Sequence, residues 1–232
     1  MLMKDLEIIP GVYLLSGFLG TGVWGANIYL LVDDNLTLVD TGFFGRVEQI
    51  LRKKTKLDYL PSDIARIIIT HHHADHVGSL AAVHKATGAR TYASRIEAEA
   101  IAAGRSSRPT KLPASTSILR RVMRRFMSPR PFQVDESLTD GEVLPVLGGL
   151  QVVDTAGHCP GHISFFSPST GILFCGDSMV TDEQGIHGSR PIFTWDPVMA
   201  QNAVKKQASL GARIVCSGHG PVVMDAAGKF PL

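Results

Sequence analysis

An α/β fold is predicted by the order in which strand-like and helix-like segments follow one another along the 232 residues. Three strands come first, at 11–16, 27–32 and 36–39, and Asp33-Asp34-Asn35 is a hairpin turn signal between the last two. Helical segments with apolar residues at intervals of three and four then alternate with short apolar strands. The length favours one compact domain, covering residues 1–232.

The helices are placed by apolar spacing and by the residues at their ends. Val47, Ile50 and Leu51 predict a helix over 44–54. Gly88 supplies the C-terminal cap of a helix over 79–87. Further helices are expected at 94–103, ending at Gly104, and from Pro197 to about residue 210. A short buried strand is predicted at 67–69, and residues 64–67 lead into it. The remaining strands are predicted at 90–93, 151–155, 163–167, 171–175 and 214–216.

Composition is that of an ordinary globular enzyme, with 44% hydrophobic and 19% charged residues, which excludes a disordered chain. Cys159, Cys175 and Cys216 show no paired spacing, so we expect three small buried residues and a cytoplasmic, reducing location. The N-terminus lacks the apolar core of a secretory signal, and no apolar run approaches the length of a transmembrane span. No nucleic-acid partner is expected, and a homo-oligomer is left open.

One segment carries the positive charge of the chain. The net charge is +2, but residues 104–134 hold eight basic residues and no acidic one, which leaves 23 − 8 = 15 basic against 21 acidic residues elsewhere. Within this segment, apolar residues recur at helical spacing over 119–127 with arginines on the other face, which predicts an amphipathic basic helix. Three interpretations stay open: a surface helix, a lid-like insertion over the active site, and a membrane-surface helix.

The most informative stretch is Thr-His-His-His-Ala-Asp-His at 70–76, directly after the apolar strand 67–69. Imidazole nitrogen is the commonest protein ligand of zinc, and a carboxylate can complete such a site. Because alternate side chains of an extended segment point the same way, His71 and His73 can close on one ion. Asp75 and His76 follow where the chain turns and can face a second ion. A tag remnant would be terminal and would lack the interposed aspartate.

The pattern His71-x-His73-x-Asp75-His76 resembles the signature of the metallo-β-lactamase superfamily, and four further motifs match that superfamily in order. The one at 155–162 resembles the glyoxalase II-like form. The match runs from about Gly11 to Pro221. The resemblance implies an αβ/βα sandwich, in which two mixed sheets are flanked by helices. The other three motifs lie at Leu38–Gly42, Phe174–Asp177 and Ser217–Pro221.

The resemblance also implies a centre for two divalent metal ions. Zinc is the expected metal, and iron or manganese is compatible with the same ligands. A metal-bridging hydroxide would attack a carbonyl carbon, and Asp75 would orient it and shuttle a proton as the catalytic residue. The expected function is hydrolysis of a small-molecule carboxylic ester, lactone or thioester, with a preference for anionic substrates. The first ion would take His71, His73 and His158, the second Asp75, His76 and His219, and Asp177 would bridge them.

Related activities are weighed against particular residues. The chain ends 13 residues after His219, so we expect no glutathione-holding extension of the glyoxalase II kind, which leaves a thioesterase with a non-glutathione substrate as an alternative. Quorum-quenching lactonases carry a catalytic tyrosine three residues after the bridging aspartate, where this chain has Val180. This difference argues against hydrolysis of acyl-homoserine lactones in the same manner. A mononuclear iron oxidoreductase resembling persulfide dioxygenases is the alternative from another class, although the complete second ligand set argues against it.

Substrate contacts are expected from the apolar, glycine-rich loop 17–25 and from the basic helix. The alternative for that loop is packing on its own core. The expected substrate-binding residues are Phe18, Leu19, Trp24, Val180 and Phe126.

Four further residues near the motifs are given supporting positions. His72 is expected to point away from the metal ligands and to be exposed or hydrogen-bonded near them. His162 and Asp40 are expected to hydrogen-bond near the metal ligands. His187 is expected in a polar loop over 181–190, outside the ligand set.

Overall fold

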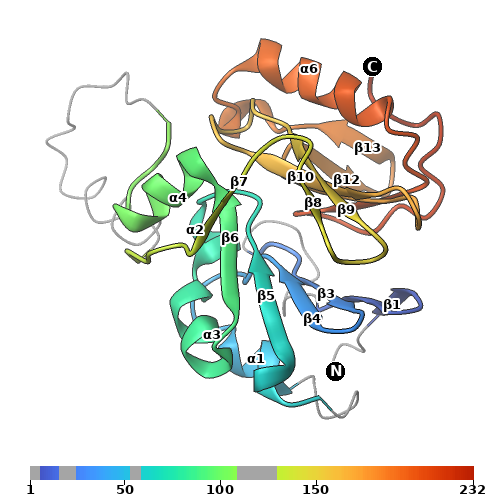
Figure 1. Cartoon of the computed structure of the whole chain (residues 1–232). Helices are drawn as coiled ribbons and strands as arrows, with labels where there is room; N and C mark the ends of the chain where they lie inside the picture. Colours follow the sequence, from blue (N-terminus) through green and yellow to red (C-terminus); the bar gives the residue numbers. More distant parts are fainter. Residues whose placement is uncertain (1–5, 16–24, 53–58, 109–129) are drawn as a thin grey trace, which may run out of the picture.

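The computed structural model describes residues 6–15, 25–52, 59–108 and 130–232. The loop 17–24 and most of the basic segment, 109–129, lie outside the described residues, and with them Phe18, Leu19, Trp24 and Phe126. Within the described residues the chain forms two large mixed β-sheets with helices on their outer sides (Figure 1). The predicted α/β class with mixed sheets is therefore confirmed.

The first sheet has seven strands that are adjacent in chain order. From the first to the fourth strand the pairing is antiparallel, and from the fourth to the seventh it is parallel. The carboxyl ends of the parallel strands therefore lie along one edge of the sheet. The strands are β1 (Leu6–Ile9), β2 (Val12–Leu14), β3 (Tyr29–Val32), β4 (Leu36–Val39), β5 (Ile64–Ile68), β6 (Arg90–Ser94) and β7 (Glu136–Leu138).

The second sheet has five strands in the order β14-β11-β10-β9-β8, and only β11 and β14 pair in parallel. A separate hairpin of β12 and β13 occupies the segment expected as a polar loop over 181–190, so that prediction is wrong. The polar residues that suggested a loop are those of the hairpin turn, 182–184, which is exposed. The strands are β8 (Val143–Leu144), β9 (Leu150–Asp154), β10 (Ile163–Ser167), β11 (Ile172–Gly176), β12 (Met179–Asp182), β13 (Gly185–Gly188) and β14 (Ile214–Ser217).

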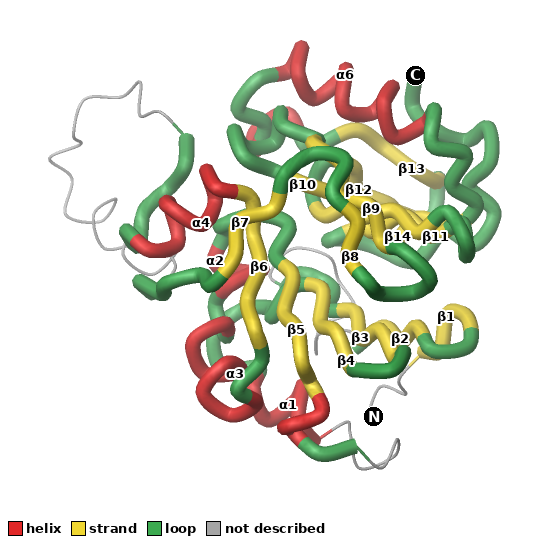
Figure 2. The backbone as a smooth tube through the Cα atoms, in the orientation of Figure 1, coloured by secondary structure: helices red, strands yellow, loops and turns green. Residues whose placement is uncertain are grey.

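The helices cover the outer sides of the sheets, α1 and α3 on the first and α6 on the second (Figures 1 and 2). Gly88 ends α3 in the left-handed conformation, as predicted, and Ser94 and Asp196 cap α4 and α6. No helix among the described residues is long and apolar enough to cross a membrane. The helices are α1 (Val47–Arg52), η2 (Pro61–Asp63), α2 (Ala74–Val77), α3 (Leu80–Thr87), α4 (Arg95–Ala102), η3 (Pro191–Phe193) and α6 (Pro197–Ala208).

Buried apolar side chains form three layers, because successive residues of a strand point to opposite faces. In β3, Leu31 belongs to the layer between the two sheets, while Leu30 packs towards the helices of the first sheet. In β11, Phe174 faces the same central layer and Leu173 faces α6. This order of layers confirms the predicted αβ/βα sandwich.

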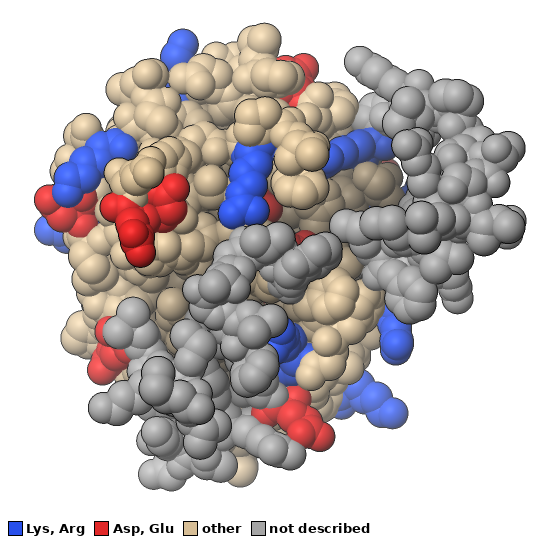
Figure 3. All heavy atoms as spheres, turned by 180° about the vertical axis from the view of Figure 1, so that it is seen from behind, with Lys and Arg blue, Asp and Glu red and all other residues tan. Residues whose placement is uncertain are grey.

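Charged side chains of the described residues are interspersed on the face turned away from the view of Figure 1 (Figure 3). Acidic and basic groups lie there among uncharged surface. Across the described residues as a whole, charged side chains form exposed pairs, as Arg90 with Glu136 and Lys206 with Asp140. Exposed ion pairs of this kind contribute little to stability, so the three apolar layers hold the fold.

Candidate metal centre

The predicted ligands lie in loops that follow strand ends. His71 to His76 follow β5 in the first sheet. Asp177 follows β11 and His219 follows β14, which are parallel neighbours in the second sheet. His158 lies in the loop between β9 and β10. The two sheets thus bring residues up to 148 positions apart (219 − 71) into one cluster.

His71, His73, His158 and Asp177 offer ligand atoms that all lie within 4.8 Å of one another. His73 Nδ1 is 2.9 Å from His71 Nε2 and 3.1 Å from His158 Nε2. Burial and the neighbouring imidazoles hold the pKa of His71 and of His73 well below the usual histidine value. These imidazoles are therefore neutral at pH 7, which is the form that binds a metal.

Asp75, His76 and His219 form a second group, also within 4.8 Å of one another. The short helix α2 turns the chain after His73, which separates Asp75 and His76 from the first group. His219 Nε2 lies 3.2 Å from Asp75 Oδ2. Burial alone would lower the pKa of His219, but the carboxylates of Asp177 and Asp75 outweigh it and raise that pKa to about 9.

Asp177 lies between the two groups. Its Oδ2 is 3.6 Å from His158 Nε2 in the first group and 3.4 Å from His219 Nε2 in the second. Its Oδ1 is 3.3 Å from His76 Nε2. One buried carboxylate therefore faces both sets of nitrogen atoms, and its role as a bridging ligand stays a prediction.

The residues present fit divalent metal ions. Among the described residues, His76 Nε2 and Asp177 Oδ1 are buried without a hydrogen-bond partner, so each group has a ligand atom left free. Gly218 keeps the space beside them open, since a Cβ there would lie 2.3 Å from Asp177 Oδ1 and 2.7 Å from His76 Cε1. Imidazole nitrogens with carboxylate oxygens are the donors that zinc takes in catalytic sites.

Asp40, at the end of β4, orients His76. Its Oδ2 lies 2.7 Å from His76 Nδ1, so the Nε2 atom of that ring is left to face Asp75 and Asp177. Its carboxylate also accepts hydrogen bonds from the Thr70 backbone N and from Thr70 Oγ1, at 2.9 and 2.8 Å. Asp40 itself has a φ of 60°. The expectation that Asp40 bonds near the metal loop is confirmed.

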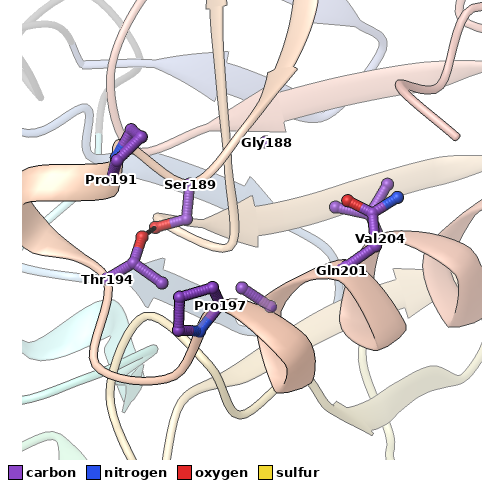
Figure 4. A pocket seen from close by; sticks show the side chains of 8 residues that line it. Gly188, Ser189, Pro191, Thr194, Pro197, Gln201 and Val204 are labelled. Atoms are coloured by element: carbon purple, nitrogen blue, oxygen red, sulfur yellow. Dashed lines mark hydrogen bonds between the residues drawn. The ribbon is translucent and has the colours of Figure 1, made fainter.

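His158 and His162 are held by hydroxyl groups. Ser189 Oγ lies 2.9 Å from His158 Nδ1 and accepts a hydrogen bond from Thr194 Oγ1 (Figure 4). Ser189 also lines a cavity of about 120 Å³ beside α6. His162 accepts a bond from the Asp177 backbone N, as expected for a supporting residue, and lies 2.8 Å from Thr155 Oγ1. Ser189 could not be predicted from the sequence, because nothing near it in the chain marks it.

Of the two positions expected for His72, exposed or hydrogen-bonded near the ligands, the structure shows the second. The residue stays out of both ligand groups and is buried, with 2% exposure. The reason is α4, whose Glu97 carboxylate lies 2.5 Å from His72 Nδ1. His187 lies outside both ligand groups, 2.8 Å from Asp182 Oδ1 beside the exposed turn of the hairpin.

Val180 is the one predicted substrate residue within the described part of the chain. It lies on β12 opposite His187 and is 9% exposed. The next residue, Thr181, donates a backbone hydrogen bond to the carbonyl of His219, which places Val180 beside the loop of the second group. A contact between Val180 and a substrate stays a prediction.

The family model of the metallo-beta-lactamase superfamily matches residues 21–219. The chain belongs to this superfamily, in agreement with its fold and its histidine and aspartate cluster. Two curated relatives are named as hydrolases. A hydroxyacylglutathione hydrolase of Rhodobacter capsulatus is 30% identical over 168 residues, which are 72% of this chain and 51% of that protein. The probable metallo-hydrolase YflN of Bacillus subtilis is 25% identical over 223 residues, 88% of this chain and 84% of that protein.

The chain spans about half the length of the hydroxyacylglutathione hydrolases that it matches over about two thirds of its own length. Among solved structures, a metallo-beta-lactamase of Cronobacter sakazakii with a HARLDQ motif superposes with a TM-score of 0.69 at 22% identity, covering 94% of this chain and 78% of that one. A metallo-beta-lactamase family protein of Thermus thermophilus gives 0.66 at 24% identity, covering 95% and 77%. At these identities the likeness concerns the fold alone.

Proposed function

We propose that this chain is a dinuclear metal-dependent hydrolase of carboxylic esters, lactones or thioesters. The observation that carries the proposal is the Asp177 carboxylate, which faces two separate groups of ligand atoms. The second group provides a place for a second ion. In this proposal one ion is held by His71, His73 and His158, the other by Asp75, His76 and His219, and Asp177 contacts both.

Two divalent ions held by these groups, with zinc the expected metal, would supply a hydroxide nucleophile at neutral pH and positive charge for the oxyanion of the transition state. The chain supplies the proton acceptor. Asp75 is the most exposed carboxylate of the cluster, with its side chain 29% exposed against 10% for Asp177. Burial raises its pKa, but the His76 charge and the His219 hydrogen bond outweigh this and lower it. An ionised carboxylate within reach of incoming substrate can take and return the proton.

Arg108 supports a preference for anionic acyl substrates. It follows α4, and its Nη2 donates a hydrogen bond to the carbonyl of Phe193. Its Nε is buried without a hydrogen-bond partner among the described residues. Its charge contributes to the lowered pKa of both His73 and His158, so the guanidinium acts on the first group of ligands. A fixed cation at this position favours a carboxylate on the substrate.

The test is metal analysis combined with kinetics. Protein purified without chelators should contain about two ions per chain by plasma mass spectrometry. Asp75→Asn should lower kcat on a panel of aryl esters, lactones and thioesters by about 10²–10⁴-fold, the usual contribution of a general base. Asp225→Asn, an exposed aspartate remote from the cluster, is the matched control and should leave kcat unchanged. Trace metal, or an Asp75→Asn variant as active as the parent, refutes the proposal.

A further inference from the structure

We infer that Glu97 is a positioning residue whose buried carboxylate ties together the two loops that carry the first ligand group, so that the affinity for one ion depends on it and the affinity for the other does not. The inference rests on the proposed dinuclear function. Glu97 lies in the first turn of α4 and is fully buried, with 0% exposure. A carboxylate in such a place needs compensating donors.

The two oxygens of Glu97 accept hydrogen bonds from different loops. Oε2 accepts a bond of 2.8 Å from the His72 backbone N and lies 2.5 Å from His72 Nδ1. Oε1 accepts a bond of 3.0 Å from the Gly161 backbone N. Burial raises the pKa of Glu97, but the bonds from His72 outweigh it and bring that pKa to about 2. Glu97 thus forms a hydrogen-bonded clamp with His72 and Gly161, and its carboxylate is ionised at every pH at which the enzyme would work.

The partners of Glu97 are neighbours of the ligands of one group. His72 lies between His71 and His73 in the chain, and its backbone N–H is fixed by the carboxylate. Gly161 belongs to the short loop between β9 and β10 that carries His158. Fixing both loops to one side chain sets the separation of His158 from the other two imidazoles. In the second group, the His76 ring is oriented by a different residue, Asp40.

The close approach of α4 to the second loop supports the same role. Ser94, the N-cap of α4, donates a bond of 2.6 Å from its hydroxyl to the Gly161 carbonyl. A Cβ at Gly161 would lie 2.7 Å from Ser94 Oγ and 2.9 Å from Glu97 Oε1, so only glycine allows this contact. The Gly161 backbone therefore lies directly against α4, and the bonds from Ser94 and to Glu97 hold it there.

A third metal site is the competing interpretation, because His72, Glu97 and Cys159 also offer ligand atoms within 4.8 Å of one another. Two of these ligands, His72 and Glu97, are already engaged with each other. The hydrogen-bonded clamp accounts for the positions of His72 and Glu97 without an ion.

The experiment measures metal affinity in backgrounds that keep one ligand group each. His219→Ala removes a ligand of the second group and His158→Ala one of the first, and zinc affinity is read by competition with a chromophoric chelator. Adding Glu97→Gln should weaken zinc binding about 10–100-fold in the His219→Ala background, the usual effect of losing a supporting hydrogen bond to a metal ligand. It should leave affinity within about twofold in the His158→Ala background. Glu99→Gln, an exposed residue of the same helix, is the matched control and should change neither.

Glu97→Asp keeps the charge but shortens the side chain, so it should give the same selective loss even if Glu97→Gln folds poorly. Equal losses in both backgrounds would show a general structural role and overturn the inference, as would no loss in either. A third zinc ion in the otherwise unchanged protein also overturns it. Fewer than two ions in the unchanged protein would instead refute the dinuclear function, whereas two ions with unchanged affinities in the Glu97→Gln variants would refute only the clamp.

Discussion

Gly218→Ala is expected to abolish metal binding while the chain still folds. The backbone of Gly218 is not in the left-handed region, so alanine is allowed there and the effect comes from space alone. The new Cβ would lie 2.3 Å from Asp177 Oδ1, whereas ordinary contacts begin at 3.4 Å. The carboxylate must therefore retreat by 3.4 − 2.3 = 1.1 Å, which is several times the roughly 0.2 Å that a metal–ligand distance tolerates.

The Oδ2 of Asp177 lies 3.4 Å from His219 Nε2 and 3.6 Å from His158 Nε2, so a movement of this size displaces the carboxylate from its place between the two groups. Crowding of this kind usually costs about 1–3 kcal/mol. For a chain of this length each 1 kcal/mol lowers the melting temperature by about 2–4 °C, so a fall of about 2–12 °C is expected in the metal-free protein.

The assay is metal content per chain together with a thermal melt of the chelator-treated protein. Gly188→Ala is the matched control, because a Cβ at Gly188 meets nothing within 4 Å and its backbone is not in the left-handed region. The control should keep two ions and the parental melting temperature. Gly218→Ala protein with full metal content and an unchanged melting temperature would refute the placement of Asp177 between the two groups.

Three further outcomes are expected. Asp40→Asn should weaken the binding of one of the two ions about 10–100-fold in a chelator competition, because an amide replaces the carboxylate that orients His76. An unchanged affinity for both ions would contradict this. Removing the ions with a chelator should lower the melting temperature reversibly, since an ion at about 100 times its Kd adds about 2.7 kcal/mol to the stability of the folded state, and an identical melt would speak against bound metal. Hydrogen bonds from Thr91 lower the pKa of Asp135, so its contribution is present above the unfolded value of about 3.9 and is lost as the pH falls through the folded value. The stability advantage over Asp135→Asn, measured by urea unfolding, should thus be constant from about pH 7 to about pH 5 and shrink below about pH 4; an advantage that grows on acidification would contradict it.

The ligand cluster was predictable because its residues are tied to strand ends. An apolar run such as 67–69 predicts a buried strand, and polar residues directly after it must lie at the edge of the sheet. The alternation of side chains then predicts that His71 and His73 face one point, and their nitrogen atoms are 2.9 Å apart. Which distant residues complete the cluster came from the order of motifs, since no local pattern connects His71 with His219.

The supporting contacts could not be predicted, because they join positions without a local signal. Ser189 lies 31 residues from His158, and Glu97 lies 25 residues from His72 and 64 from Gly161. A serine after a strand and a glutamate in a helix are common, and only packing shows that each reaches a metal loop. The strands β1, β7 and β8 were missed for a similar reason, since segments of two to four residues carry too little alternation to be recognised.

Each ligand group draws on both sheets of the sandwich. In the first group, His71 and His73 come from the loop after β5, and His158 comes from the second sheet. In the second group, Asp75 and His76 come from that same loop, and His219 follows β14. Neither sheet alone carries a complete group, so each ion would tie one sheet to the other at the end of the central apolar layer. Metal binding in the proposed centre is therefore coupled to the packing of the two sheets. For this reason, removal of the ions should lower the stability of the whole sandwich and not only the activity.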